Sequence, residues 1–87
     1  MSQRKRVTFV LEAPGARRVC LAGSFNGWAA DKEPMRPDGR GRWVKVKYLQ
    51  PGEHQYKFVV DGQWWQDPAR PEAAPNPYGS ANSVLRL

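Results

Sequence analysis

The sequence YKFVVDGQWWQD, residues 56–67, decides how this chain folds. Two apolar runs flank its Asp-Gly pair, which is the strongest short-range signal for a β-hairpin. A two-residue turn of type I′ needs positive φ at both central positions, and Asp61 and Gly62 tolerate that conformation. We therefore predict a tight hairpin whose turn consists of these two residues.

This turn fixes the register of the two strands. Val59 then lies opposite Trp64, Phe58 lies opposite Trp65, and directly opposed residues share a face. The predicted core face consists of the residues of one phase: Tyr56, Phe58, Val60 and Trp65. The predicted solvent face consists of the other phase: Lys57, Val59 and Trp64. A slip of one residue would exchange the two tryptophans, so the alternative is a buried Trp64 and an exposed Trp65.

Length and composition describe one small domain. The chain has 87 residues, of which 40% are hydrophobic and 25% are charged, an ordinary globular mixture. A domain of this size has a thin core, so it has little room for the four tryptophans of the sequence. We expect some of these rings to serve a function at the surface.

The net charge of +6 is spread along the chain rather than gathered in a stripe. This dispersal favours a solvated surface over a nucleic-acid site. Residues 1–6 are expected to form a flexible basic lead-in to a single domain at 7–87.

No apolar run is long enough to cross a membrane, and the single Cys20 allows no disulfide within the chain. These features predict a cytoplasmic protein with no membrane partner, and Met1 favours a free-standing chain.

Four further segments carry strand patterns. They lie at residues 7–11, 17–22, 43–49 and 82–87. In the second, Val19 and Leu21 share one face and Cys20 takes the other. In the third, the lysines indicate that Val44 and Val46 face inward, which leaves Trp43 outside unless a bulge reverses it.

Residues 29–41 and 66–81 read as loops because prolines and glycines interrupt both. The second of these loops is long and contains four prolines. A loop of this length in a small domain more often has a function than serves only as a connection. Six to eight short strands without a helix predict an all-β, antiparallel, immunoglobulin-like β-sandwich.

The sequence contains no recognisable catalytic constellation. His54 is the single histidine and precedes a strand, so we interpret it as a structural turn residue. No phosphate-binding glycine loop precedes a helix, and no cysteine-based metal site is possible. We therefore expect no catalytic residue, no metal and no cofactor.

Three segments resemble a known family in their order and spacing. They read GSFNGW at 23–28, PGEHQYKFVVDGQWWQDP at 51–68 and YGSANS at 78–83. They are similar to the glycogen-binding domain of the AMP-activated protein kinase β subunit, which belongs to carbohydrate-binding module family 48. The resemblance covers most of 7–87. It implies an early-set immunoglobulin-like sandwich that binds α-1,4-linked glucans such as glycogen, starch, maltooligosaccharides and cyclodextrin, without catalysis.

The resemblance also implies a set of carbohydrate-binding residues. It places stacking rings at Trp28 and Trp64, a hydrogen-bonding lysine at Lys57, and loop contacts at three further positions: Tyr78, Ser80 and Asn82. Two positions depart from the family pattern. Tyr78 stands where the kinase domain has leucine, and Trp65 stands where a smaller residue is usual. We expect Trp65 to pack inward against Phe58; the alternative is that its ring forms an additional platform.

Other interpretations of these residues stay open. Trp28 alone is equally typical of a loop anchor packed on Pro34, and Tyr78 alone of a ring packed on the prolines of its own loop. At the level of function, the alternative is an interaction module that docks onto a kinase or a glycogen-metabolising enzyme. Nucleic-acid binding through basic and aromatic residues is the least favoured of the three, so no nucleic-acid partner is expected.

Overall fold

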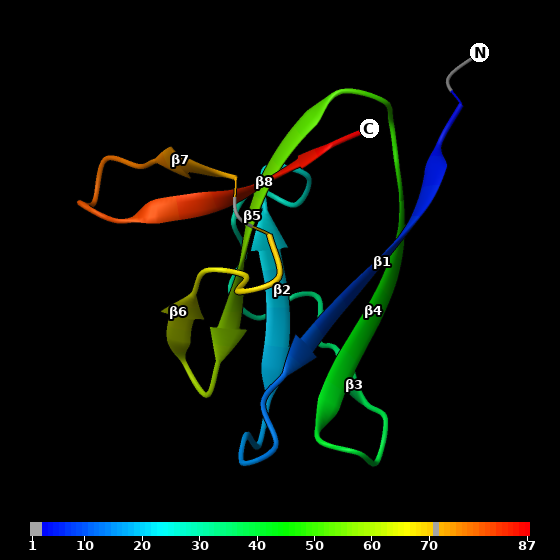
Figure 1. Cartoon of the computed structure of the whole chain (residues 1–87), viewed down its shortest axis with the longest axis vertical. Helices are drawn as coiled ribbons and strands as arrows, with labels where there is room; N and C mark the ends of the chain where they lie inside the picture. The colour runs from blue at the N-terminus through cyan, green and yellow to red at the C-terminus, as the bar shows by residue number, and fades with distance from the viewer. Residues whose placement is uncertain (1–2, 71) are drawn as a thin grey trace.

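Two antiparallel sheets pack face to face in the computed structural model, which describes residues 3–70 and 72–87 (Figure 1). The strands are β1 Lys5–Glu12, β2 Val19–Gly23, β3 Arg36–Pro37, β4 Arg42–Leu49, β5 Glu53–Val60, β6 Gln63–Trp65, β7 Ala73–Pro75 and β8 Ala81–Arg86. The predicted class, an all-β antiparallel sandwich, is confirmed.

The smaller sheet has the order β1-β4-β3, and the larger has the order β2-β5-β8-β7 with β6 also paired to β5. Strand β5 therefore organises the larger sheet. Along one edge it pairs with β2, whereas along the other edge its first half pairs with β8 and its second half with β6. Strands β8 and β6 thus follow one another along the same edge of β5.

The hairpin has the register that the sequence predicts. Val59 is opposite Trp64 and Phe58 is opposite Trp65, and φ is 49° at Asp61 and 84° at Gly62. Asp61 also ties the turn to the segment before β2, because its Oδ1 accepts the backbone N–H groups of residues 17 and 18 at 2.9 Å each. These hydrogen bonds anchor the turn to the chain just before β2.

The core lies between the two sheets. Its largest fully buried side chains are Tyr56, Phe9, Phe58, Leu11, Leu21 and Val19. Cys20 belongs to a second, smaller cluster on the outer face of the larger sheet, together with Ala22 and Val59. The predicted alternation of residues 19–21 is confirmed.

The predicted orientation of β4 is wrong. Trp43 is buried and its Nε1–H donates to the carbonyl oxygen of Ala13 at 3.0 Å, whereas Val46 and Tyr48 are exposed. The β1–β4 pairing is continuous and contains no bulge. The inward phase of β4 therefore includes both of its lysines.

A distant carboxylate explains how a lysine occupies that phase. Lys47 Nζ lies 2.6 Å from Glu33 Oε1 and 4.7 Å from the centroid of the Phe25 ring. The amphipathic side chain covers apolar surface with its stem while its head is paired. Lysine at this position therefore does not mark the solvent face.

Both predicted loops contain more structure than expected. In residues 29–41, Met35 is buried, Pro34 bridges to Cys20, and β3 pairs with β4. In residues 66–81, strand β7 pairs with β8 and ends at Pro75; this edge position tolerates a proline. Pro71 and residues 1–2 lie outside the described residues, and β1 begins at Lys5, inside the predicted lead-in.

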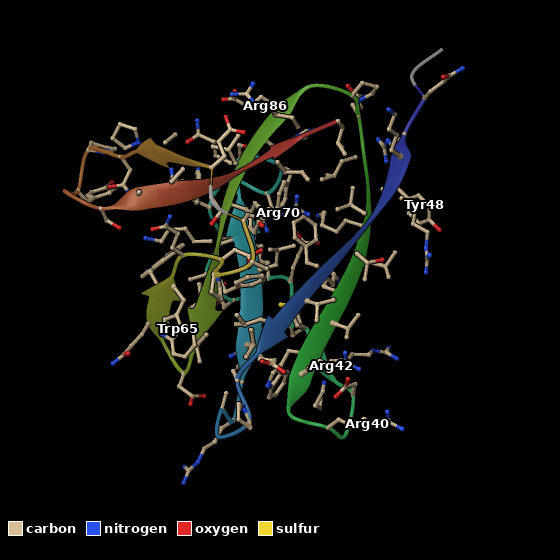
Figure 2. All side chains as sticks on the ribbon, viewed as in Figure 1. Arg40, Arg42, Tyr48, Trp65, Arg70 and Arg86 are labelled. Carbon is tan, nitrogen blue, oxygen red and sulfur yellow. The ribbon has the colours of Figure 1, made fainter. Side chains whose placement is uncertain are left out.

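Trp65 shares the face of Phe58 as predicted, yet the expectation that it belongs to the core is wrong. Its side chain is 38% exposed. Strand β6 is a short edge strand, and the smaller sheet does not cover it. Figure 2 shows Trp65 and Tyr48 on opposite sides of the molecule.

A buried hydrogen-bond network joins β5, the segment after β6, and β8. The Tyr56 hydroxyl donates to Asp67 Oδ2, and the Asp67 N–H donates to Ser83 Oγ at 2.8 Å. All of these residues are buried. Arg70 lies near the same carboxylate, with its Nε 3.9 Å from Oδ2. This network holds the strand that follows the proline-rich segment in register with β5.

We expect Tyr56→Phe to lower the free energy of unfolding by about 2 kcal/mol at neutral pH. The substitution keeps the ring and removes one donor from a buried carboxylate. Urea denaturation of the two proteins measures the difference. A change within about 0.5 kcal/mol would show that the network carries no net stability.

The same pair predicts a pH dependence. Burial, and then the hydrogen bond to Asp67, raises the pKa of Tyr56 above its ordinary value of 10.0. The folded state keeps a phenol proton that the unfolded state releases, so this contribution is present below pH 10 and is lost as pH rises. Above that pH, wild-type stability should fall more steeply than that of Tyr56→Phe, by up to about 1.4 kcal/mol per pH unit.

Candidate functional site

A groove of about 970 Å³ opens on the outer face of the larger sheet. It contains every carbohydrate-binding residue expected from the sequence: Trp28, Lys57, Trp64, Tyr78, Ser80 and Asn82. Five residues that were not predicted also line it: Ser24, Glu53, Gln55, Asn76 and Pro77. The structure thus brings side chains from four separate segments of the chain to one surface.

Two tryptophans form one wall of the groove. The centroids of the Trp28 and Trp64 rings are 6.5 Å apart, and their planes are inclined by 48°. Trp64 comes from β6 and is 45% exposed. Trp28 is partly buried against the outer cluster that includes Val59. The two rings therefore form a bent apolar surface rather than a flat one.

The loop that carries Trp28 is fixed by side-chain hydrogen bonds. Asn26 Oδ1 accepts the Gly23 N–H at 3.0 Å, and Asn26 Nδ2 donates to Leu21 O at 3.0 Å and to Glu33 Oε2 at 2.6 Å. Trp28 has a φ of 60°, a conformation that a bulky residue rarely adopts. Its N–H donates to Gly23 O at 3.0 Å, which closes the loop and fixes the direction of the indole.

Lys57 forms the centre of the polar floor. Its side chain is only 7% exposed, and its Nζ donates to Ser80 Oγ at 2.7 Å. None of the ion pairs among residues 3–70 and 72–87 involves Lys57. An ammonium group offers several N–H donors, so Lys57 is suited to donate to acceptor atoms of a ligand in the groove.

A chain of amide side chains extends this floor. Asn76 Nδ2 donates to Asn82 Oδ1 at 3.1 Å, and Asn82 Nδ2 donates to Gln55 Oε1 at 3.1 Å. Gln55 Nε2 lies 3.4 Å from Glu53 Oε2. Glu53 and Gln55 share the strand phase of Lys57, so the alternation of β5 would have revealed both of them.

Tyr78 lies at the tip of the β7–β8 hairpin, which extends from the body of the protein in Figure 1. Its side chain is 90% exposed, which contradicts the alternative that it packs on neighbouring prolines. Asn76 Oδ1 accepts the N–H groups of Tyr78 at 3.0 Å and Ser80 at 3.2 Å. The turn is ordered through its backbone while the phenol ring stays free at the rim.

Other site types find little support in the part of the chain that the structure describes. No group of three or more His, Cys, Asp and Glu side chains there is arranged to hold a metal ion. His54 Nε2 lies 2.8 Å from Gln50 O, which agrees with a turn role. The same residues include no helix of the length and hydropathy needed to span a membrane.

The fold and the groove define a ligand-recognition module of the β-sandwich class. The family described as the glycogen recognition site of AMP-activated protein kinase matches residues 6–87. The chain belongs to this family, which confirms the resemblance predicted from the sequence.

Known relatives agree with this assignment. The β-1 subunit of 5′-AMP-activated protein kinase from Sus scrofa is 37% identical over 86 residues, which are 99% of this chain and 67% of that protein. The β-2 subunit from Homo sapiens is 36% identical over 86 residues, 99% of this chain and 30% of that protein. The chain thus spans two thirds of the first relative and under a third of the second.

A solved structure supports the fold. Maltogenic amylase from S. marinus contains a region that matches 97% of this chain and 14% of that protein, with a TM-score of 0.82 and 22% identity. At this identity the likeness shows the fold alone.

Asn76→Ala should loosen the rim of the groove without unfolding the sandwich. The substitution removes the acceptor of two backbone N–H groups and the donor to Asn82. We expect amide hydrogen exchange at Tyr78 and Ser80 to become about tenfold faster, as for a local loss of about 1.4 kcal/mol. Asn76→Asp keeps the acceptor and is the matched control, so equal exchange rates in both variants would contradict the role of Oδ1.

Proposed function

We propose that this protein binds α-1,4-linked glucans in the groove without transforming them. The observation that carries the proposal is the pair of inclined indole rings, 6.5 Å apart, beside a floor of hydrogen-bonding side chains. The family, whose description names glycogen recognition, supports the same ligand.

The chemistry of a glucose unit matches this arrangement. A pyranose ring has an apolar C–H face that packs on an aromatic plane and a rim of hydroxyl groups. Successive units of an α-1,4-linked chain are inclined to one another, as the two indoles are. Lys57, Gln55 and Asn82 supply both donors and acceptors for the rim.

The charges in the groove favour a neutral ligand. Among its lining residues, Lys57 is the one cation and Glu53 the one carboxylate. A nucleic-acid strand would need several cations along its phosphates. We therefore expect binding that barely changes with salt, and of weak to moderate strength because the groove is open and hydrated.

Trp64→Ala should weaken binding of maltoheptaose and glycogen by at least about tenfold, because it removes one stacking plane. Affinity electrophoresis in glycogen gels and calorimetric titration with maltoheptaose measure the effect. Tyr48→Ala removes an exposed aromatic ring from the opposite sheet and is the matched control. Unretarded migration of the wild type would refute the proposal itself.

The absence of catalysis belongs to the same proposal. The groove contains a single carboxylate, whereas most glycoside hydrolases use two that flank the bond. Incubation with maltoheptaose should therefore release no shorter sugar. The cytoplasmic location predicted from the sequence stays a prediction.

A second function is supported by a different surface. The outer face of the β1–β4 pair exposes Val10, Val46 and Tyr48. Adjacent exposed apolar side chains of this kind are typical of protein-docking faces. The relatives from Sus scrofa and Homo sapiens are named as subunits of a kinase. We propose that this face docks onto a kinase or a glycogen-metabolising enzyme while the groove stays open.

Val46→Glu tests the docking face. The added charge should reduce capture of such a kinase or enzyme at least tenfold in a pull-down assay, since a buried charge without a partner is costly. Glycogen retardation should be unchanged. Trp64→Ala should show the reverse pattern, and loss of partner capture on adding maltoheptaose would place docking in the groove instead.

A further inference from the structure

A second hollow lies beneath the hairpin, on the opposite face of the larger sheet from the groove. It has a volume of about 250 Å³ and is bordered by Trp65 of β6, Val60 and Asp61 of the hairpin turn region, and residues 12–16. The loop after β1 thus forms one side and the hairpin the other. None of these residues borders the groove.

The alternation of β6 explains how the two sites are related. Trp64 and Trp65 are neighbours in one strand, so their rings point to opposite faces of the sheet. Trp64 pairs with Val59 on the groove side, and Trp65 pairs with Phe58 on the core side. Trp65 is 38% exposed, and Figure 1 shows β6 at the side of the molecule away from β1 and β4.

The lining of the hollow combines three kinds of surface. Trp65 supplies an aromatic plane, and Ala13, Pro14 and Ala16 supply apolar contact. Asp61 supplies a carboxylate at its border. Asp61 is already oriented, because its Oδ1 accepts the N–H groups of residues 17 and 18. The hollow therefore offers acceptors for hydroxyl groups beside an aromatic plane.

The size and charge of the hollow limit which ligands it can bind. Pockets that enclose a drug-sized ligand have roughly 300 to 1,000 Å³, so 250 Å³ suits a single ring. The Asp61 carboxylate at the border disfavours phosphates and other anions. A neutral polyhydroxylated ring satisfies both limits, since its hydroxyls donate to carboxylates and its C–H face packs on indole.

We propose that the Trp65 hollow is a second saccharide site, which takes one glucose unit of a glucan. The identity of this sugar rests on the proposed function of the groove. The two sites face opposite sides of one hairpin, so a short linear chain occupies them separately. A branched glucan with many chain ends engages both sites, which raises its apparent affinity through effective concentration.

The test follows maltoheptaose by two-dimensional NMR of backbone amides and indole N–H groups. In Trp64→Ala, shifts at Lys57 and Asn82 should be largely lost. Shifts at Gly15, Ala16 and the Trp65 indole should persist, with a dissociation constant in the millimolar range. Trp65→Ala should show the opposite pattern, with groove affinity within twofold of wild type. Asp61→Asn keeps a residue suited to the turn and removes the carboxylate, so it is a second variant in case Trp65→Ala perturbs the hairpin.

The outcomes separate this proposal from the function of the groove. Saturation of the wild-type groove without any shift at Gly15, Ala16 or the Trp65 indole would overturn the second site alone. If maltoheptaose shifts no signal of the wild-type protein, either in the groove or around the Trp65 hollow, both proposals are wrong. In glycogen gels, Trp65→Ala should reduce retardation about tenfold. If Trp65→Ala instead leaves glycogen binding unchanged and abolishes capture of a protein partner, the hollow is a docking site and the proposal is wrong.

Discussion

The two-residue turn at Asp61 and Gly62 is the constraint on which both surfaces of the hairpin depend. Side chains alternate with a period of two, so moving the turn by one residue would exchange the faces of every residue in β6. Positive φ at both positions fixes the turn, and the bonds from Asp61 to the segment before β2 hold it in place. The direction in which each tryptophan points follows from this turn.

The accuracy of prediction from sequence depends on the range of the interaction that decides each feature. The hairpin register follows from residues that are adjacent in the chain, and it is confirmed. The orientation of β4 depends on the pairing of Lys47 with Glu33, fourteen residues earlier, and no local pattern reveals that contact. The alternation of β6 predicts the correct face for Trp65, but its exposure of 38% depends on the packing of the other sheet, which no local pattern reveals.

The candidate site shows the same division. All of the predicted residues line one groove. The resemblance indicates which positions to expect there, and the alternation of β5 places Lys57 on the outer face of the sheet. Gln55 was missed although it lies two residues from Lys57 on the same strand. Asn76 could not have been found, since its acceptor role appears only once β7 and β8 are paired. The sugar-binding roles of these residues remain proposals.

The way in which Tyr78 is held has an evolutionary consequence. The fold fixes the backbone of its turn through Asn76, while the side chain itself contacts almost nothing. Substitution at this position therefore carries little penalty in folding, and surface changes of this kind are usually close to neutral for stability. The sandwich acts as a constant frame, and the rim residue is free to diversify. The proposed preference for one glucan shape over another can therefore change at this position while the core stays the same.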